Sequence, residues 1–167
     1  MKPKITGRVR KFGDNIDTDV ITPGTILNLR IDEVKKYAFS PIMKDFYKTV
    51  QLGDIIVAGK NFGCGSSREK ATEVVKALGI YVIVCDSMAR IYFRNCLGLG
   101  MYPIISRGVS NIFDEGDEIE IDTVRGEIRN PKTGRTTSFG PLSPVAQEIL
   151  AAGGILPLLK RQIEKRQ

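Results

Sequence analysis

The residues whose types and spacing could do chemistry are concentrated in one stretch, Gly63-Cys64-Gly65-Ser66-Ser67-Arg68. Its glycines permit positive φ and let a ligand approach the backbone closely. The Ser66 and Ser67 hydroxyls can form hydrogen bonds, and the Arg68 guanidinium is a planar fork that suits a carboxylate or a phosphate. By residue type alone, the stretch predicts an anion site with two hydroxyls at its centre.

The flanking sequence predicts the elements that position this stretch. The apolar run at 54–58 is typical of a buried strand, and apolar residues between 71 and 78 recur at helical spacing. We expect Ser66 or Ser67 to cap that helix, whose free N–H groups and dipole would favour an anion in front of it. A capped helix start explains one serine and one or two glycines but not the whole set. We therefore interpret the stretch as a functional site.

Several other chemistries do not fit this sequence. The stretch lacks the third glycine of a dinucleotide fingerprint, the Gly-Lys-Ser/Thr end of a P-loop and the pattern of a nucleophile elbow. The sequence contains no histidine, which excludes a Ser-His-Asp device and a His-ligated metal. Cys64, Cys85 and Cys96 lack the short spacings of a zinc or iron–sulfur site. We therefore expect this chain to bind no metal.

Length, composition and charge predict one ordinary globular domain. The chain has 167 residues, of which 42% are hydrophobic and 26% charged. The net charge is +6, but basic residues cluster only at Lys160-Arg161 and Lys165-Arg166 and no aromatics alternate with them. We interpret that cluster as a solvated tail, not a nucleic-acid site. No segment is typical of a signal peptide or a membrane span, and an odd number of cysteines argues against a secreted disulfide framework, so we expect a cytoplasmic chain without membrane contact.

The sequence around the glycine-rich stretch resembles a known family. The stretch 63–69 resembles the Gly-x-Gly-Ser-Ser-Arg-Glu signature of the aconitase superfamily, and in particular the separate small subunits of the 3-isopropylmalate dehydratase and homoaconitase group. The segments 7–19, 87–95 and 148–154 agree in order and spacing, so the resemblance covers nearly the whole chain. It implies an α/β fold, the swivelling β/β/α domain, as a single three-layer domain over residues 1–167 with a mobile specificity loop at about 25–50.

The resemblance also implies the reaction and the roles of four residues. The reaction isomerises 2-isopropylmalate and 3-isopropylmalate by dehydration and rehydration, a step of leucine biosynthesis. Ser66 would be the base, acting as an alkoxide, and Asp19 would lie at the active site. Ser67 and Arg68 would bind a substrate carboxylate. The Lewis acid would be a 4Fe–4S cluster in a large partner subunit, so this hydro-lyase would work only as a heterodimer or heterotetramer.

Substrate choice is predicted to depend on the segment Asn28-Leu29-Arg30. Homoaconitase-like relatives carry an arginine at the position of Asn28, where it would pair with an extra carboxylate. Asn28 cannot neutralise a carboxylate, and Leu29 offers apolar contact to a branched alkyl group. We expect Arg30 to point to solvent. The segment therefore favours isopropylmalate, with homoaconitate and shorter alkylmalates such as methylmalate or dimethylmalate as alternatives.

Two functions from other classes use the same features. A stand-alone anion-binding regulatory module would need the glycine-rich stretch but no chemistry at Ser66 and no partner. A nucleic-acid binder would depend only on the positive charge. A brown, iron-containing complex with a larger chain would support the enzyme over both.

The rest of the chain predicts strands and helices around these segments. Ser87 is expected to cap a helix with Met88, Ile91 and Tyr92 on its inner face. Helices are also expected at 31–39, 143–152 and 156–165, and a hairpin turn at 129–135. Further strands are expected at 5–12, 80–84, 103–105 and 117–122.

Overall fold

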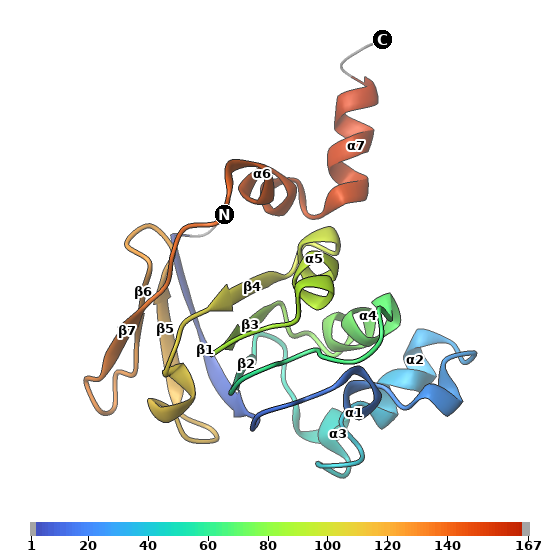
Figure 1. Ribbon diagram of the computed structural model, residues 1–167, viewed down its shortest axis with the longest axis horizontal. Coiled ribbons are helices and arrows are strands. Elements are labelled where there is room, and N and C mark those ends of the chain that lie inside the picture. The colour runs from blue at the N-terminus through green and yellow to red at the C-terminus, as the bar shows by residue number, and fades with distance from the viewer. Residues whose placement is uncertain (1–2, 165–167) are drawn as a thin grey trace.

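A seven-stranded mixed sheet forms the centre of the fold in the computed structural model, which describes residues 3–164 (Figure 1). The strand order is β4-β3-β2-β1-β5-β6-β7. Strands β1 to β4 pair in parallel, and β1, β5, β6 and β7 pair antiparallel. The strands are β1 (Lys4–Lys11), β2 (Ile55–Ala58), β3 (Val82–Cys85), β4 (Tyr102–Ile105), β5 (Glu118–Asp122), β6 (Glu127–Arg129) and β7 (Thr136–Ser138).

Helices fill the connections between the parallel strands and follow β7. The α-helices are α1 (Thr18–Ile21), α2 (Ile31–Val34), α3 (Phe46–Thr49), α4 (Glu69–Ala77), α5 (Arg90–Gly98), α6 (Pro144–Ala152) and α7 (Ile155–Glu164). Short 3-10 turns lie at Gly24–Ile26, Lys35–Tyr37 and Val109–Asn111. None of the helices between residues 3 and 164 has the length and apolar character needed to cross a membrane.

The parallel strands carry two hydrophobic cores, one on each face. Successive side chains of a strand point to opposite faces. In β2, Ile56 and Ala58 join one core, while Ile55 and Val57 join the other. β3 divides in the same way, and both strands are buried along their whole length. The continuous apolar runs at 54–58 and 80–84 follow from burial on both faces.

The two cores make three layers, as the β/β/α expectation requires. Neighbouring parallel strands joined by crossovers of one hand place all their helices on one face. Accordingly, each of α1 to α5 contributes to the first core, through residues that include Ile21, Val34, Phe46, Val74 and Tyr92. The second core is closed by the antiparallel half of the curled sheet, including Ile119, Ile121 and Ile128. Figure 1 shows the helices and β5–β7 on opposite sides of β2 and β3.

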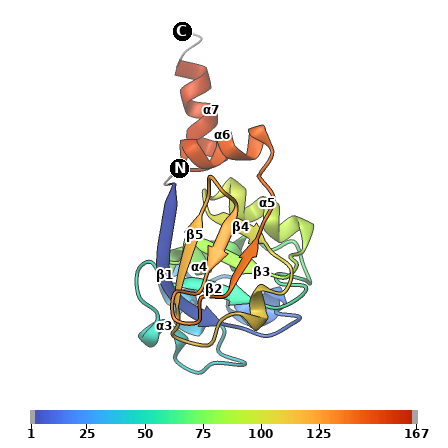
Figure 2. The same cartoon turned by 90° about the vertical axis from the view of Figure 1, so that its left-hand side faces the viewer.

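The two edges of the parallel strands carry different segments. The connections after β1 and β2 meet at the carboxyl-terminal edge, where Asp17 pairs with Cys64 in an isolated bridge. Leu150 of α6 lies at the opposite edge, beside a hollow of about 370 Å³ that Ile5, Gly53 and Tyr81 also line. Figures 1 and 2 show α7 standing clear of the sheet beyond α6. The glycine-rich stretch and α7 therefore lie at opposite edges.

Most predicted elements are confirmed, and two helix predictions are wrong in detail. The predicted helix at 31–39 ends as α2 at Val34 and continues only as a 3-10 turn. Ser87 does not cap α5, whose N-cap is Ala89; instead the Ser87 hydroxyl accepts the Asn61 N–H at 2.8 Å. Ile91, predicted on the inner face, is 49% exposed. Local sequence propensity correctly predicts α5, but the bridge between Phe62 and Met88 sets the residue at which this helix begins.

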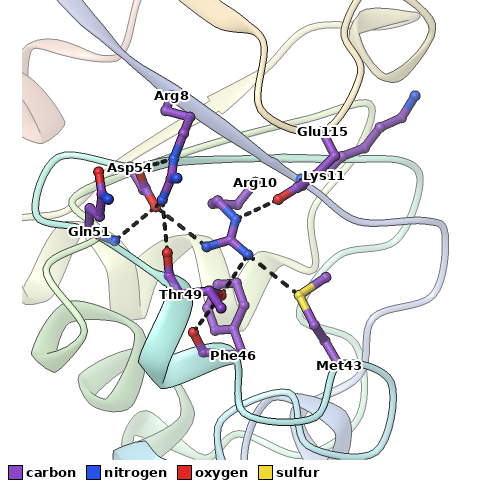
Figure 3. A network of polar contacts seen from close by, with 9 residues as sticks. All are labelled: Arg8, Arg10, Lys11, Met43, Phe46, Thr49, Gln51, Asp54 and Glu115. Atoms are coloured by element: carbon purple, nitrogen blue, oxygen red, sulfur yellow. Dashed lines mark hydrogen bonds and ion pairs between the residues drawn. The ribbon is translucent and has the colours of Figure 1, made fainter.

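The long connection between β1 and β2 is fastened at its far end by a buried arginine (Figure 3). Arg10 is 5% exposed and its guanidinium lies 4.6 Å from the centre of the Phe46 ring. It donates to Glu115 at 2.7 Å and to the Thr49 hydroxyl at 3.1 Å. The Asp54 carboxylate lies 3.6 Å from the same guanidinium. Phe39 and Phe46 are fully buried, so the later part of segment 25–50 is packed into the core.

Candidate functional site

The glycine-rich turn keeps its shape because two glycines occupy positions that side chains cannot. Gly63 has φ +71° and lies against the Tyr92 ring, which a Cβ at this position would overlap. Gly65 has φ +99°, and a Cβ there would come within 3.0 Å of the Thr18 hydroxyl oxygen. Only glycine adopts such positive φ values without a steric cost. The glycine-rich turn therefore packs closely against α5 on one side and against α1 on the other.

Neither serine caps α4, contrary to the sequence-based expectation. The N-cap is Arg68, and no side chain closes this helix start. Ser66 and Ser67 are both exposed at the turn before it. Capping would have occupied one hydroxyl with the helix backbone. Because it does not, neither hydroxyl is bound to the helix backbone, and both can face a ligand in front of the helix.

Ser66 lies against the buried Thr18 of α1. The Ser66 N–H donates to the Thr18 hydroxyl oxygen at 3.1 Å, and the two hydroxyl oxygens are 3.3 Å apart. The Thr18 N–H donates to the Cys64 carbonyl at 2.9 Å, and Asp17 caps α1 by accepting the Val20 N–H at 2.7 Å. The turns after β1 and β2 are thus joined at the residue that the sequence predicts to be the base.

Arg68 and Asp19 form an ion pair beside the serines. The Arg68 Nη1 donates to the Asp19 carboxylate. Gly24 lies against this pair, where a Cβ would come within 3.3 Å of both the Arg68 Nη1 and the carboxylate oxygen. The Arg68 side chain is 27% exposed and that of Asp19 63%. Asp19 is therefore next to the site, and it contacts Arg68 directly.

The segment predicted to select the substrate, Asn28-Leu29-Arg30, lies beside the first turn of α4. Lys70 of α4 donates to the Leu29 carbonyl at 2.9 Å, and the Arg30 N–H donates to Glu33 at 3.4 Å. Asn28, Leu29 and Arg30 are all exposed, Leu29 at 40%. The backbone of this segment is therefore tied to the helix that begins at the site, while its side chains face outward.

Comparison with known proteins bears directly on this arrangement. The sequence profile of the aconitase C-terminal domain matches residues 11–107, which contain the glycine-rich turn, Asp19 and the Asn28-Leu29-Arg30 segment. The chain belongs to the aconitase family.

Within the aconitase family, the chain resembles separate small subunits over its full length. It is 46% identical to the 3-isopropylmalate dehydratase small subunit 1 of Thermotoga maritima, over 94% of this chain and 95% of that protein. It is 43% identical to the isopropylmalate/citramalate isomerase small subunit of Methanocaldococcus jannaschii, over 100% of both. The crystal structure of a 3-isopropylmalate dehydratase from Methanocaldococcus jannaschii superposes with a TM-score of 0.91 at 40% identity, covering 98% of this chain and 97% of that chain.

Two contacts of this aconitase-family site escaped the sequence analysis. They are made by Thr18 and Lys70, neither of which the sequence singled out. The buried hydroxyl of Thr18, at the start of α1, could not be placed beside Ser66 from the sequence, because the two residues are 48 positions apart. Its position within the 7–19 segment that resembles the family was the only available signal.

Residues 3–164 offer no ligand set for a metal cluster. In the part of the chain that the structure describes, no three His, Cys, Asp or Glu side chains are grouped as a metal would require. All three cysteines are free, and Cys85 and Cys96 are buried. A 4Fe–4S cluster does not fit these residues, so no step is assigned to such a group on this chain.

Proposed function

We propose that the chain is the small subunit of a 3-isopropylmalate dehydratase, a hydro-lyase that isomerises 2-isopropylmalate and 3-isopropylmalate by removing and re-adding water. The observation that carries the proposal is the pair of exposed serine hydroxyls just before α4, beside the Arg68–Asp19 pair. Full-length similarity to small subunits with that name supports it.

Ser66 is proposed to remove the proton from the carbon next to a substrate carboxylate. A serine hydroxyl is a poor base unless its alkoxide is stabilised, because efficient proton transfer needs a pKa near the working pH. The positive end of the α4 dipole, the free N–H groups of its first turn and the Arg68 charge all favour an anion at this point. The same residue would return a proton when water is re-added on the other carbon.

Ser67 and Arg68 are proposed to hold a substrate carboxylate. The Arg68 Nη1 is engaged by Asp19, while its Nη2 has no partner between residues 3 and 164. That edge of the guanidinium and the Ser67 hydroxyl can both donate hydrogen bonds to a substrate carboxylate. Asp19 would then keep the fork in one orientation, and we infer a supporting role for it at the active site.

The proposed reaction also needs a larger partner. The names of the relatives describe small subunits, which implies a larger subunit beside them. We propose that this subunit carries a 4Fe–4S cluster that supplies the Lewis acid for the departing hydroxyl, and that the two form a heterodimer or heterotetramer in the cytoplasm. The exposed Ser66 and Ser67 then face a site that closes only on assembly.

The preferred substrate is proposed to be isopropylmalate. Leu29 offers an apolar contact beside Asn28, and neither side chain can neutralise a third carboxylate. Arg30 is exposed and its side chain has no partner among the described residues, so it is the residue that could admit homoaconitate. The name of the Methanocaldococcus jannaschii relative favours citramalate, a methylmalate, as a second substrate. Apolar pockets discriminate by only ~1–3 kcal/mol per methylene.

A single assay of the assembled pair tests this proposal. The chain is co-expressed with the large subunit of the same organism, and kcat/KM is measured for isopropylmalate, citramalate and homoaconitate. We expect isopropylmalate to be the best substrate and Arg30→Ala to leave that order unchanged. A preference for homoaconitate that disappears in Arg30→Ala would assign the chain to the tricarboxylate enzymes. Anion binding without turnover of any substrate would favour a regulatory module.

A further inference from the structure

We propose that Thr18 is a positioning residue that donates a hydrogen bond to the Ser66 hydroxyl oxygen and so holds it ready to act as a base. The inference rests on the proposed function and adds a residue to it. Thr18 belongs to α1, whereas Ser66 precedes α4, so the contact joins two segments that the chain separates by 48 residues.

The direction of the hydrogen bonds follows from what a hydroxyl can offer. A threonine hydroxyl has one hydrogen and two acceptor lone pairs. The Thr18 oxygen already accepts the Ser66 N–H at 3.1 Å, which leaves its hydrogen free to donate. The Ser66 oxygen, 3.3 Å away, is the acceptor within reach in the described part of the chain. When Ser66 loses its proton, only Thr18 can be the donor of this pair.

Such a bond strengthens when Ser66 becomes an alkoxide. Hydrogen bonds from a hydroxyl to an anionic oxygen are shorter and about twice as strong as neutral ones. A bond that favours the charged form lowers the pKa of the group that carries the charge. Thr18 would therefore stabilise the reactive form of Ser66 more than its resting form. The 3.3 Å separation in the free chain leaves room for this tightening.

The surroundings of Thr18 fix its hydroxyl before any substrate binds. Thr18 is 1% exposed, and its N–H is held by the Cys64 carbonyl at 2.9 Å. Gly65 lies so close that a Cβ there would come within 3.0 Å of the Thr18 hydroxyl oxygen. A β-branched side chain in such a place has little rotamer freedom. A donor that is fixed in advance costs no reorganisation during the reaction.

Three variants of Thr18 in the assembled two-subunit enzyme test the proposal. Thr18→Val removes the hydroxyl at nearly constant shape, Thr18→Ser keeps the hydroxyl, and Ser66→Ala is the reference for complete loss. We expect Thr18→Val to lower kcat on isopropylmalate about 100-fold, as for loss of one fixed donor to an oxyanion, with a much smaller change in KM. Thr18→Ser should stay within several-fold of the wild type.

The pH profile separates this role from simple packing. A base that works as an alkoxide gives a kcat that rises with pH, and loss of the donor makes the alkoxide harder to form. The rise should therefore move to higher pH in Thr18→Val, by about one unit or more, and return in Thr18→Ser. A packing defect would lower stability or assembly without moving the profile. If Thr18→Val does not assemble, Thr18→Ala is compared with Thr18→Ser on the same two measurements.

The outcomes distinguish this inference from the proposed function. A wild-type complex without isomerase activity, or a fully active Ser66→Ala, would overturn the proposed function. A wild-type complex that is active and an inactive Ser66→Ala, together with near-normal kcat and pH profile in Thr18→Val, would overturn only the role of Thr18. A Thr18→Ser variant as impaired as Thr18→Val would also overturn it.

Discussion

At the residue scale, Ser66 is held by one neighbour and is still open to a ligand. Its N–H donates to the Thr18 hydroxyl, whose oxygen also lies 3.3 Å from the Ser66 hydroxyl oxygen, while the Ser66 side chain lies exposed at the turn. Ser67 is exposed beside it and Arg68 is steadied by Asp19. The proton transfer proposed for Ser66 and the carboxylate binding proposed for Ser67 and Arg68 would thus use different side chains, and the two functions should respond differently to substitution.

Replacing Ser66 should therefore affect turnover more than binding. In the assembled complex, we expect Ser66→Ala to lower kcat by roughly 1000-fold or more, as for an essential proton-transfer group, while KM changes little. Arg68→Lys is the matched comparison, because a point charge replaces a bidentate fork and KM should rise instead. Steady-state kinetics on isopropylmalate measure both. A Ser66→Ala enzyme with normal kcat would remove Ser66 as the base.

The three cysteines should differ sharply in reactivity. Burial raises the pKa of the Cys85 thiol to about 12 and that of Cys96 further, whereas Cys64 is only half-buried at the site. Since the thiolate is the reactive form, a thiol reagent at pH 7 should label the native chain once, at Cys64. In urea all three should react. Mass spectrometry after brief labelling gives the count, and fast native labelling of Cys96 would contradict the packing around α5.

The residue types at the site could be predicted from the sequence, but their contacts could not. The glycines, serines and arginine predict an anion site, because each of these residue types has the local chemistry that such a site needs. The capping role predicted for Ser66 or Ser67 was wrong because the bridges of Cys64 with Asp17 and of Phe62 with Met88 hold the turn before the helix, and such long-range pairings leave no local pattern. The ion pair of Arg68 with Asp19 is likewise a long-range contact that no local pattern predicts.

At the element scale, segment 25–50 of the connection between β1 and β2 is bound to the rest of the fold near both of its ends. Lys70 of α4 binds it at Leu29, and Arg10 binds it at Thr49 beside the buried Phe46. The intervening segment includes the fully buried Phe39. The resemblance implies a mobile specificity loop at about 25–50, and that mobility stays a prediction. The structure shows Asn28, Leu29 and Arg30 exposed, whereas Phe39 and Phe46 pack into the core, a contact of scattered aromatics that periodicity does not reveal.

The Arg10 network should make stability depend on pH. Burial would raise the pKa of the Asp54 carboxyl, but hydrogen bonds from Arg8 and the Gln51 N–H and the charges of Arg8 and Arg10 outweigh it and hold that pKa below its ordinary value. A depressed folded pKa means that the contribution is fully present above the unfolded value of about 3.9 and is lost as pH falls through the folded value.

Replacing Asp54 tests this directly. Asp54→Asn should lower the free energy of unfolding by about 2 kcal/mol at neutral pH, because Arg8 loses its carboxylate acceptor and the buried Arg10 keeps only Glu115 as a charged partner in the described part of the chain. Its stability should also fall less steeply than that of the wild type between about pH 5 and pH 3. Asp32→Asn, which removes an exposed pair with Lys35, is the control and should change little. Urea unfolding across this pH range gives both values; parallel slopes for Asp54→Asn and the wild type would be inconsistent with the network.

At the scale of the whole molecule, the described chain carries the serines and the Arg68–Asp19 pair but no metal ligand set. Purified alone, it should neither turn over isopropylmalate nor bind iron, and activity should appear when the large subunit is added. An iron assay and an isomerase assay on the same preparation measure this. Turnover by the single chain with iron absent would contradict the division of labour proposed between the two subunits.

The placement of α7 at the edge opposite to Ser66 has a practical consequence. The first strand begins at that same edge, so both ends of the described chain leave the molecule away from the serines (Figure 1). An affinity tag, a fluorophore or a fusion partner at either end would leave the reactive face open. The same geometry allows the chain to be immobilised in one known orientation, with that face turned toward the solution from which a large subunit is captured.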